Sequence, residues 1–531
     1  MPSPTLLPTR ASFAMGEPVG IEIGADDGVT GTLSVWRLGE LVHREEGAGR
    51  GIRLLEGLDR GGYGIELEIG DSVVARTAVE VARDQNARLR YGFVASYRPG
   101  KDTAAVARFA RRLHLNGIQF YDWAYRHAEL LGGGEEYDDA LGQPISLATV
   151  RDLVGAVQGA GSRAYGYAAV YAVGPNEWEA WSEHALLAPS GEPYALGDFL
   201  FLVDPAARPW LDHFRGELAR AVTEIGFDGF HLDQYGYPKF AASPDGRSVD
   251  VGESFVRGIE GVRDALPEAR LIFNNVNDFP TWRTAGAPQD AVYIEVWEPQ
   301  TTLGSLAAVV TRARAAGSGK PVVIAAYQHV YDRADAAASD RATSLTMATL
   351  FSHGATQLLA GEAGRLLVDP YYVRNHEAEP QTLHLLARWY DFLVEHDALL
   401  QDPAIVEVTG SYAGDYNGDL DVSYVETPVT GDPIAGSVWR RITSTSHGLV
   451  MHLINLRGQS DTLWDAPRAE PESPGEGTLR FRLVRGRMPR VRVADPDAQP
   501  RLIDLPVRLE GDHAVVILPA PNIWQVVHIE L

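Results

Sequence analysis

Two acidic side chains stand where short apolar runs end, and their surroundings suit acid and nucleophile chemistry. In the segment DGFHLDQYG, alternation places Asp233 at the point where the apolar run stops. In AVYIEVWEP, Glu295 shares one face of the run with Tyr293 and Trp297, while valine and isoleucine occupy the other face. Cleavage of a glycosidic bond needs two such carboxyl groups, one ionised and one protonated. Because flanking aromatic rings remove water from Glu295, we expect its pKa to rise toward that of a proton donor.

Neighbouring acids compete for these roles. Asp228 begins the segment that contains Asp233, and its position is typical of a turn between a helix and a strand. Glu298 directly precedes Pro299 and faces away from Glu295, so a loop position fits it better. A salt bridge with an arginine at the rim of the domain is the structural alternative for either acid. Two such acids on alternate strands weaken that alternative.

Further polar and aromatic residues follow the same kind of apolar run. Carboxylates and amides accept hydrogen bonds from hydroxyl groups, and aromatic faces stack on the C–H surfaces of sugars, so this mixture indicates a carbohydrate cleft. The alternative is that strand ends are polar only because they meet solvent. The residues are Tyr121, Asp122, Trp123, Tyr125, Arg126, Tyr171, Gln234, Tyr235, Asn274, Asn275, Asn277, Asp278, Tyr327, Gln328, His329 and Glu362.

The elements that would position these side chains alternate between residues 89 and 400. Eight apolar runs are each followed by a stretch of helical period, although the helix behind the fifth run is weak. This pattern predicts a multidomain chain with a central (β/α)8 TIM barrel, while an eight-stranded open sheet would leave a similar trace. We expect strands at 91–97, 117–123, 163–170, 228–235, 270–275, 291–297, 321–327 and 356–361, and helices at 102–115, 146–159, 207–225, 251–265, 303–316, 342–351 and 380–395.

Both flanks of the barrel have strand-like patterning. Short alternating runs separated by Gly/Asp-rich turns predict a small β-sandwich over residues 1–88. Similar runs predict an antiparallel β-sandwich over residues 401–531, in which the acidic, Pro-rich segment 465–477 is expected to be a surface loop. The predicted strands of the two flanks are 20–25, 31–38, 64–70, 73–82, 437–444, 448–456, 479–484, 490–495 and 513–520.

Composition limits the partners and the compartment. The chain has 531 residues with 47 Lys+Arg and 71 Asp+Glu, which gives a formal net charge of −24. That charge repels phosphate backbones and anionic lipids, so we expect neither nucleic acid nor a membrane surface as a partner. The absence of cysteine excludes disulfides and cysteine nucleophiles. Residues 1–14 lack the basic region and apolar core of a secretory signal, so we expect a cytoplasmic protein, or a secreted one whose leader was removed.

The sequence lacks the motifs of several other mechanisms. No G-x-S-x-G, G-x-x-x-x-G-K-[ST] or H-E-x-x-H pattern occurs. His127 and His329 could touch a ligand, but without clustered partners an ordinary hydrogen-bonded histidine fits each better. The acidic segment EEYDD at 135–139 lacks an EF-hand pattern, which favours a solvated face over a Ca²⁺ site. We therefore expect no metal and no cofactor.

Five segments are similar to those of a known family. They are GIQFYDWAYRH, GFDGFHLDQYG, YIEVWEP, VDPYYVRNHE and VMHLINLRGQSDTLWDAP. Over about residues 90–465 the chain resembles glycoside hydrolase family 66, which comprises dextranases and cycloisomaltooligosaccharide glucanotransferases. The resemblance implies an N-terminal immunoglobulin-like sandwich at 1–88, a (β/α)8 catalytic barrel at 89–400 and a C-terminal Greek-key β-sandwich at 401–531.

The resemblance also implies a reaction and a set of site residues. The reaction is retaining cleavage or transfer at α-1,6-glucosidic bonds of dextran or isomaltooligosaccharides. Asp233 corresponds to the family's nucleophile and Glu295 to its acid/base, in agreement with the choice made from strand geometry. Asp122 matches a further acidic residue of the family's active site, and we expect it to hold hydroxyl groups of the sugar. The other predicted substrate contacts are Trp123, Tyr125, Tyr235, Trp297, Gln328 and His329.

Three other functions stay open. Cyclising members of the family carry a long carbohydrate-binding module inserted in the barrel, and the absence of such an insertion here disfavours cyclisation without removing it. An α-amylase-like or α-glucosidase-like barrel shares the D-G-F-x-x-D pattern, but His231 stands where the α-amylase pattern has an arginine. A silent glucan-binding protein is the alternative outside enzymes, and intact Asp233 and Glu295 disfavour it. The sequence carries no signal for oligomeric state or for endo versus exo action.

Overall fold

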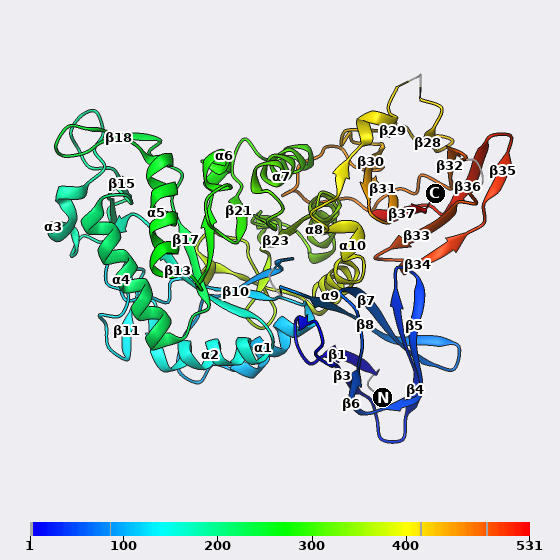
Figure 1. Cartoon of the computed structure of the whole chain (residues 1–531), viewed down its shortest axis with the longest axis horizontal. Helices are drawn as coiled ribbons and strands as arrows, with labels where there is room; N and C mark the ends of the chain where they lie inside the picture. Colours follow the sequence, from blue (N-terminus) through cyan, green and yellow to red (C-terminus); the bar gives the residue numbers. More distant parts are fainter. Residues whose placement is uncertain (1–3, 85–86, 415–416, 485–486, 531) are drawn as a thin grey trace.

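The chain forms three β-rich parts. The computed structural model describes residues 4–84, 87–414, 417–484 and 487–530. Strands near the N-terminus, in blue, and near the C-terminus, in orange and red, lie on one side of a large central part that carries most of the helices (Figure 1). Buried apolar side chains form three clusters, one centred on each part. The predicted multidomain architecture is therefore confirmed at this level.

The central part is built on a parallel sheet. Its strands pair in the order β9-β10-β13-β17-β20-β21-β22-β23, and the short β24 pairs with β9. Residues 355–361 contain both β23, which pairs with β22, and β24, which pairs with β9 at the other end of the series. The bounds are β9 (Tyr91–Val94), β10 (Gly117–Phe120), β13 (Arg163–Ala169), β17 (Gly229–Asp233), β20 (Arg270–Asn274), β21 (Ala291–Glu295), β22 (Val322–Ala325), β23 (Ala355–Gln357) and β24 (Ala360–Gly361), continued by the antiparallel β25 (Arg365–Leu366) and β26 (His376–Glu377).

Helices connect most of these strands and begin at sequence-encoded caps. The side chains of Asp102, Asp250 and Asp335 each accept a hydrogen bond from the first turn of a helix. The predicted weak helix behind the fifth strand is only α6. Within the described residues, no helix is both long and apolar enough to cross a membrane. The helices are α1 (Thr103–Arg112), α2 (Leu147–Gly159), α4 (Arg208–Ile225), α5 (Val251–Ala265), α6 (Thr281–Thr284), α7 (Leu303–Gly317), α8 (Ala336–Ser352), α9 (Pro380–Glu395) and α10 (Asp397–Leu400).

Long connections leave the carboxyl ends of three strands. After β10, the hairpin of β11 (Glu136–Asp138) and β12 (Pro144–Ser146) precedes α2. After β13, α3 (Trp178–Trp181) and the small sheet of β14 (Ala172–Val173), β16 (Leu200–Leu202) and β15 (Ala195–Leu196) precede α4. After β17, the hairpin of β18 (Phe240–Ala242) and β19 (Ser248–Asp250) precedes α5. These connections supply side chains to the cavity described below.

The N-terminal part consists of two sheets. One has the order β1-β3-β6 and the other the order β2-β8-β7-β4-β5. All four predicted strands of this region are present, and β5 was not predicted because seven of its first eight residues are exposed, which removes the apolar period. The bounds are β1 (Thr5–Pro8), β2 (Phe13–Ala14), β3 (Val19–Gly24), β4 (Thr30–Arg37), β5 (Glu40–Gly49), β6 (Gly51–Leu55), β7 (Gly61–Ile69) and β8 (Ser72–Ala82).

The C-terminal part also pairs its strands in two sheets. One has the order β27-β30-β31-β37-β33-β34, with β29 beside β30, and the other the order β28-β32-β36-β35. The bounds are β27 (Val406–Glu407), β28 (Leu420–Ser423), β29 (Val429–Thr430), β30 (Val438–Thr445), β31 (Gly448–Asn455), β32 (Gly477–Arg482), β33 (Arg490–Asp495), β34 (Gln499–Leu505), β35 (Arg508–Glu510), β36 (His513–Leu518) and β37 (Trp524–Glu530).

The loop between β31 and β32 ties the C-terminal part to the central part. Its residues 465–477 contain no helix and reach a strand only at their last residue, as predicted. They are not simply a surface loop, however, because Asp465 accepts a hydrogen bond from the backbone of Val330 at 2.8 Å. Just before them, the buried Trp464 donates from its indole to the carbonyl of Gln300 at 2.7 Å.

Buried charges join the N-terminal part to the central part. Arg76 of β8 pairs with Glu66 of β7 and with Glu395 at the end of α9. Both carboxylates are almost fully buried. Because an unpaired buried charge is strongly destabilising, this triad makes the interface depend on all three side chains.

Candidate functional site

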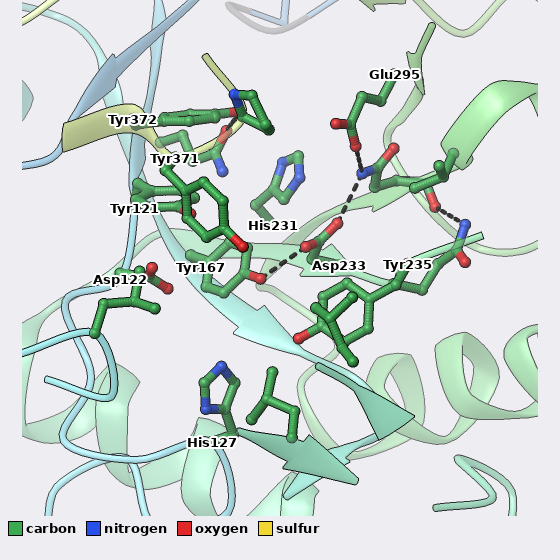
Figure 2. A pocket seen from close by; sticks show the side chains of 18 of the residues that line it. Tyr121, Asp122, His127, Tyr167, His231, Asp233, Tyr235, Glu295, Tyr371 and Tyr372 are labelled. Atoms are coloured by element: carbon green, nitrogen blue, oxygen red, sulfur yellow. Dashed lines mark hydrogen bonds between the residues drawn. The ribbon is translucent and has the colours of Figure 1, made fainter. Parts of the chain in front are cut away.

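A cavity of about 250 Å³ opens at the carboxyl ends of the central strands. The final residues of β17, β20 and β21 line it, together with side chains from the connections that follow β10, β13 and β22. Aromatic and carboxyl side chains predominate in the wall (Figure 2). This composition matches the carbohydrate cleft that the sequence indicated.

Three neighbouring strands end in the three polar residues at the centre of the cavity. Asp233 ends β17, Asn274 ends β20 and Glu295 ends β21, and these strands pair side by side. The side-chain amide of Asn274 donates to Asp233 Oδ1 at 2.7 Å and to Glu295 Oε2 at 2.8 Å. Because both oxygens bond to one nitrogen, they lie at most about 5.5 Å apart. That separation suits a retaining pair, whereas inverting pairs are about 6.5–9.5 Å apart.

Each carboxylate accepts a second hydrogen bond from a tyrosine. Tyr167 donates to Asp233 Oδ2 at 2.7 Å, and Tyr327 donates to Glu295 Oε1 at 2.9 Å. These phenols orient the two carboxyl groups from opposite sides of the Asn274 amide. Figure 2 shows Asp233 between Tyr167 and the amide, with Glu295 beyond it. Both acids are therefore held at both oxygens before any ligand binds.

The electrostatic environment separates the roles of the two acids. Burial raises the pKa of Glu295 to about 7, and the neighbouring charge of Asp233 adds to that rise. Burial also raises the pKa of Asp233, but hydrogen bonds from Tyr167, Asn274 and the backbone of Gln234 oppose it. An ionised Asp233 next to a protonated Glu295 is the state that these effects favour. This is the protonation state required of a nucleophile and a general acid.

Asp122 and His127 lie on the far side of the cavity from Glu295 (Figure 2). Burial raises the pKa of Asp122 to about 8, with further contributions from Asp139 and Asp233. Burial lowers the pKa of His127 to about 4, and its buried Nδ1 has no hydrogen-bond partner among the described residues. The expectation of an ordinary hydrogen-bonded histidine is therefore wrong for this nitrogen. Neutral Asp122 and neutral His127 are both able to bond sugar hydroxyl groups.

Stacked aromatic rings form another wall. Tyr121 and Tyr372 stack with ring centroids 4.2 Å apart. His231 lies beneath, with its ring 4.6 Å from that of Tyr293, and burial lowers its pKa to about 3. A neutral His231 adds no positive charge beside Asp233. The wall therefore presents flat apolar faces and neutral hydroxyl groups, which suit an uncharged sugar.

The predicted substrate contacts divide into two groups. Asp122, Tyr235 and Trp297 line the cavity beside Asp233 and Glu295. Glu298, the rejected alternative to Glu295, is exposed and does not line the cavity. The other predicted contacts, which are Trp123, Tyr125, Gln328 and His329, do not line this cavity.

Trp123 and Gln328 are core residues. The Trp123 ring is fully buried, packs 4.8 Å from the ring of Phe227 and donates from its indole to the carbonyl of Tyr167 at 3.1 Å. Gln328 is likewise fully buried, and Thr343 donates to its side-chain oxygen at 3.3 Å. Neither side chain reaches the cavity, because both follow the ends of their strands, where the alternation of faces no longer applies.

Tyr125 and His329 lie outside the cavity wall for different reasons. Tyr125 packs against Tyr137 with ring centroids 5.5 Å apart, under the guanidinium of Arg126. His329 lies 3.5 Å from Asp465 of the C-terminal loop, and this hydrogen-bonding partner raises its pKa. His329 is thus an ordinary hydrogen-bonded histidine, as the sequence argument favoured, and joins two parts of the chain.

Several cavity residues were not among the predicted contacts. Asn274, Tyr121 and Tyr327 were recognised only as polar strand-end residues, and Tyr167 and Tyr372 were not singled out. Tyr167 pairs in register with His231, two positions before Asp233, so the period of two would have placed it on the cavity face. Among the described residues, no group of three or more His, Asp or Glu side chains could hold a metal ion.

The sequence is similar to those of known glycoside hydrolases and glucanotransferases. The sequence signature of Glycosyl hydrolase family 66 matches residues 57–528. A cycloisomaltooligosaccharide glucanotransferase of Niallia circulans is 25% identical over 407 residues, covering 68% of this chain and 41% of that protein. A dextranase of Streptococcus salivarius is 23% identical over 469 residues, covering 75% of this chain and 56% of that protein. This chain thus spans roughly half the length of these curated relatives.

A solved structure shares the fold. It is a Paenibacillus cycloisomaltooligosaccharide glucanotransferase complexed with cycloisomaltoheptaose, and it superposes with a TM-score of 0.88. The alignment covers 98% of this chain and 99% of that chain at 18% sequence identity. At that identity the likeness concerns the fold alone.

Proposed function

This chain belongs to glycosyl hydrolase family 66, and on that premise we propose that it is a retaining glycoside hydrolase acting on α-1,6-glucosidic bonds of dextran or isomaltooligosaccharides. The observation that carries the proposal is the carboxylate pair joined by Asn274, whose oxygens lie at most about 5.5 Å apart. The dextranase and glucanotransferase names of the relatives support the substrate class. The aromatic side chains in the wall of the cavity support it as well.

The proposed reaction proceeds in two displacements. Asp233 attacks the anomeric carbon while protonated Glu295 donates its proton to the departing 6-oxygen, which gives a covalent β-glucosyl-enzyme. Glu295, now ionised, then removes a proton from water or from a sugar hydroxyl group, and the α configuration is restored. Tyr167 and Tyr327 keep the two carboxyl groups aimed at the sugar throughout. Asp122 and His127 bind hydroxyl groups of the sugar that receives the attack. The chemistry requires no cofactor.

Transfer to a sugar acceptor is the main alternative to hydrolysis. Two relatives from Niallia circulans are named cycloisomaltooligosaccharide glucanotransferases, which favours an α-1,6 transglycosylase as the second candidate. A non-catalytic glucan-binding protein is a third candidate, and the retained carboxylate pair argues against it. The balance between water and sugar as acceptor amounts to roughly 1–3 kcal/mol of differential binding.

We propose a finer architecture along with the function. Residues 89–400 form a closed (β/α)8 barrel between an immunoglobulin-like sandwich at 1–88 and a Greek-key β-sandwich at 401–531. The pairing of residues 355–361 with both β22 and β9 supports the closure. The separate strand pairings of the two flanking parts support the division into three domains.

Product analysis tests the proposed function. Dextran, isomaltooligosaccharides and maltooligosaccharides are incubated with the protein and resolved by thin-layer chromatography, and the first product anomer is assigned by proton NMR. We expect linear isomaltooligosaccharides with the α configuration, and cyclic products would favour the transferase. Asp233→Ala and Glu295→Gln should each lower turnover by several orders of magnitude. Cleavage of maltooligosaccharides alone, a β product, or near-normal activity of either variant would reject the proposal.

A further inference from the structure

The exposed Phe and Trp side chains gather around one end of the central sheet. Among the described residues, Phe240, Trp282 and Trp297 are the only Phe or Trp residues that are at least 36% exposed, at 67%, 66% and 37%. Phe240 begins β18, Trp282 lies in α6 and Trp297 follows β21. These segments follow the neighbouring strands β17, β20 and β21, which are the strands that end in the carboxylate pair and Asn274. Isolated exposed apolar residues are common, but a group beside a cavity marks a binding surface.

Trp297 connects this group to the cavity. Its ring lines the cavity and lies 5.6 Å from the ring of Tyr327, which bonds to Glu295. Its backbone N–H donates to Asn277 at 3.4 Å, and the Asn277 amide donates to the carbonyl of Glu298 at 2.7 Å. These two hydrogen bonds connect the segment after β20 to the segment after β21. The exposed indole of Trp282 lies five residues beyond Asn277 on the segment after β20.

Packed and charged neighbours hold Trp282 and Phe240 near each other. The Trp282 ring lies 5.7 Å from the ring of Phe279, and the ammonium of Lys239 lies 3.6 Å from the centroid of the same Phe279 ring. Phe240 follows Lys239 directly and pairs in register with Asp250. Asp250 in turn forms a 2.9 Å ion pair with Arg283, the residue after Trp282. In Figure 1, β18 and α6 lie at the same edge of the central part.

The position of the group relative to Glu295 indicates which part of a substrate it meets. The proton donor lies beside the sugar that departs, and Glu295 is two residues from Trp297. Asp122 and His127 lie on the opposite side of the cavity from Glu295, where the proposed mechanism places the sugar that is attacked. We therefore expect a chain that continues past the departing sugar to leave the cavity over Trp297, on the side where the segments with Trp282 and Phe240 follow the neighbouring strands β20 and β17.

We propose that Trp297, Trp282 and Phe240 form an aromatic track that binds the leaving-group portion of a long α-1,6-glucan chain. This inference rests on the proposed function and adds the site that selects long substrates. The track also binds acceptor chains in the second displacement, so that it favours transfer over hydrolysis when long chains are present. The occupant is a glucan rather than a protein because Trp297, one member of the track, lines the cavity that contains the carboxylate pair.

The test measures kcat/KM over isomaltooligosaccharides of increasing length and over dextran. In Trp282→Ala and Phe240→Ala, the ratio of kcat/KM on long chains to that on isomaltose should fall roughly 2- to 10-fold relative to the wild type. Trp282→Phe keeps an aromatic face and should retain most of that ratio. Leu54→Ala, a control on β6 that removes another side chain exposed by 63%, should leave the whole series unchanged. Far-ultraviolet circular dichroism confirms that each variant is folded.

The outcomes separate this inference from the proposed function. A wild-type protein that neither binds nor cleaves any α-1,6-glucan rejects the proposed function and the track together. A wild-type protein that cleaves glucans, with variants that lose activity equally at every length or not at all, rejects the track alone. Loss of binding to an unrelated protein, with glucan kinetics unchanged, would assign the exposed aromatic residues to a protein partner instead.

Discussion

Replacing Asn274 with alanine removes the single amide that bonds to both carboxylates. In the proposed first displacement, negative charge develops on Glu295 as its proton leaves, and the 2.8 Å bond from Asn274 stabilises that charge. A hydrogen bond to a charged group contributes about 1.5–3 kcal/mol, and each 1.36 kcal/mol changes a rate tenfold. We therefore expect kcat/KM on isomaltooligosaccharides to fall by about one to two orders of magnitude.

The pH profile distinguishes this effect from general damage. The Asn274 bond lowers the pKa of Glu295 and also that of Asp233, because in each case it stabilises the ionised form. Without it both pKa values rise, so both limbs of the bell-shaped profile of kcat/KM should move to higher pH while the maximum falls. A 4-nitrophenyl α-glucoside has a leaving group that needs little protonation. Its cleavage should therefore lose less activity than that of isomaltooligosaccharides.

Asn455 offers a matched control. It is 1% exposed, as against 2% for Asn274, and its amide also donates two hydrogen bonds, to the carbonyls of Glu472 and Asn522 at 2.9 and 3.0 Å. Asn455→Ala should therefore lower stability to denaturant by a comparable amount without moving either limb. Limbs that stay in place in Asn274→Ala, or that move to lower pH, would refute the assigned coupling. Equal losses on both kinds of substrate would refute the role in protonation.

Three further predictions concern the same structure. Since burial raises the pKa of Glu295 to about 7, the alkaline limb of kcat/KM should decline roughly tenfold per pH unit above that value as the acid loses its proton; an alkaline decline that begins near pH 4 would contradict the assignment. Trp123→Ala should lower the free energy of unfolding by about 3–5 kcal/mol, measured with urea. A variant with a raised KM and normal stability would show instead that Trp123 contacts the substrate. Arg76→Ala leaves Glu395 buried without its cation and Glu66 with Arg501 alone, 3.8 Å away, so it should cost about 3–5 kcal/mol at pH 7. Because burial raises the pKa of Glu66, a smaller cost at low pH, where Glu66 is neutral, is the accompanying check.

The elements with strong apolar period were predictable. All eight predicted central strands and every predicted helix are present. The strands were recognisable because burial on both faces of a parallel sheet requires apolar runs. Elements without that pressure were missed, and so was β37, although all but its last residue are buried. The exposed β5 and the short β35, with every residue exposed, have polar side chains on both faces, so no period marks them.

Site residues were predictable at the last residue of a strand, and beyond it the predictions divided: Asp122, Tyr235 and Trp297 line the cavity, whereas four other predicted contacts do not. Asp233 and Glu295 both end their strands, where period-two alternation still determines the facing direction. Trp123 lies past the end of β10 and after Asp122, whose positive φ of 44° turns the chain. That turn directs the indole into the core, and no local sequence pattern predicts the turn. Asn274 is also the last residue of its strand, but because an amide does not titrate, the sequence argument gave it no catalytic role.

The shared amide also makes the two displacements interdependent in the proposed mechanism. The charge of Asp233 is the second largest cause of the raised pKa of Glu295. When Asp233 becomes an ester in the glycosyl-enzyme, that charge disappears and the pKa of Glu295 falls, so the former acid becomes the base needed for the second step. Asn274, released from a charged partner, then bonds more strongly to the newly ionised Glu295. One residue at the end of β20 thus stabilises whichever carboxylate carries the charge, and this explains why the middle strand of the three ends in an amide rather than in a third acid.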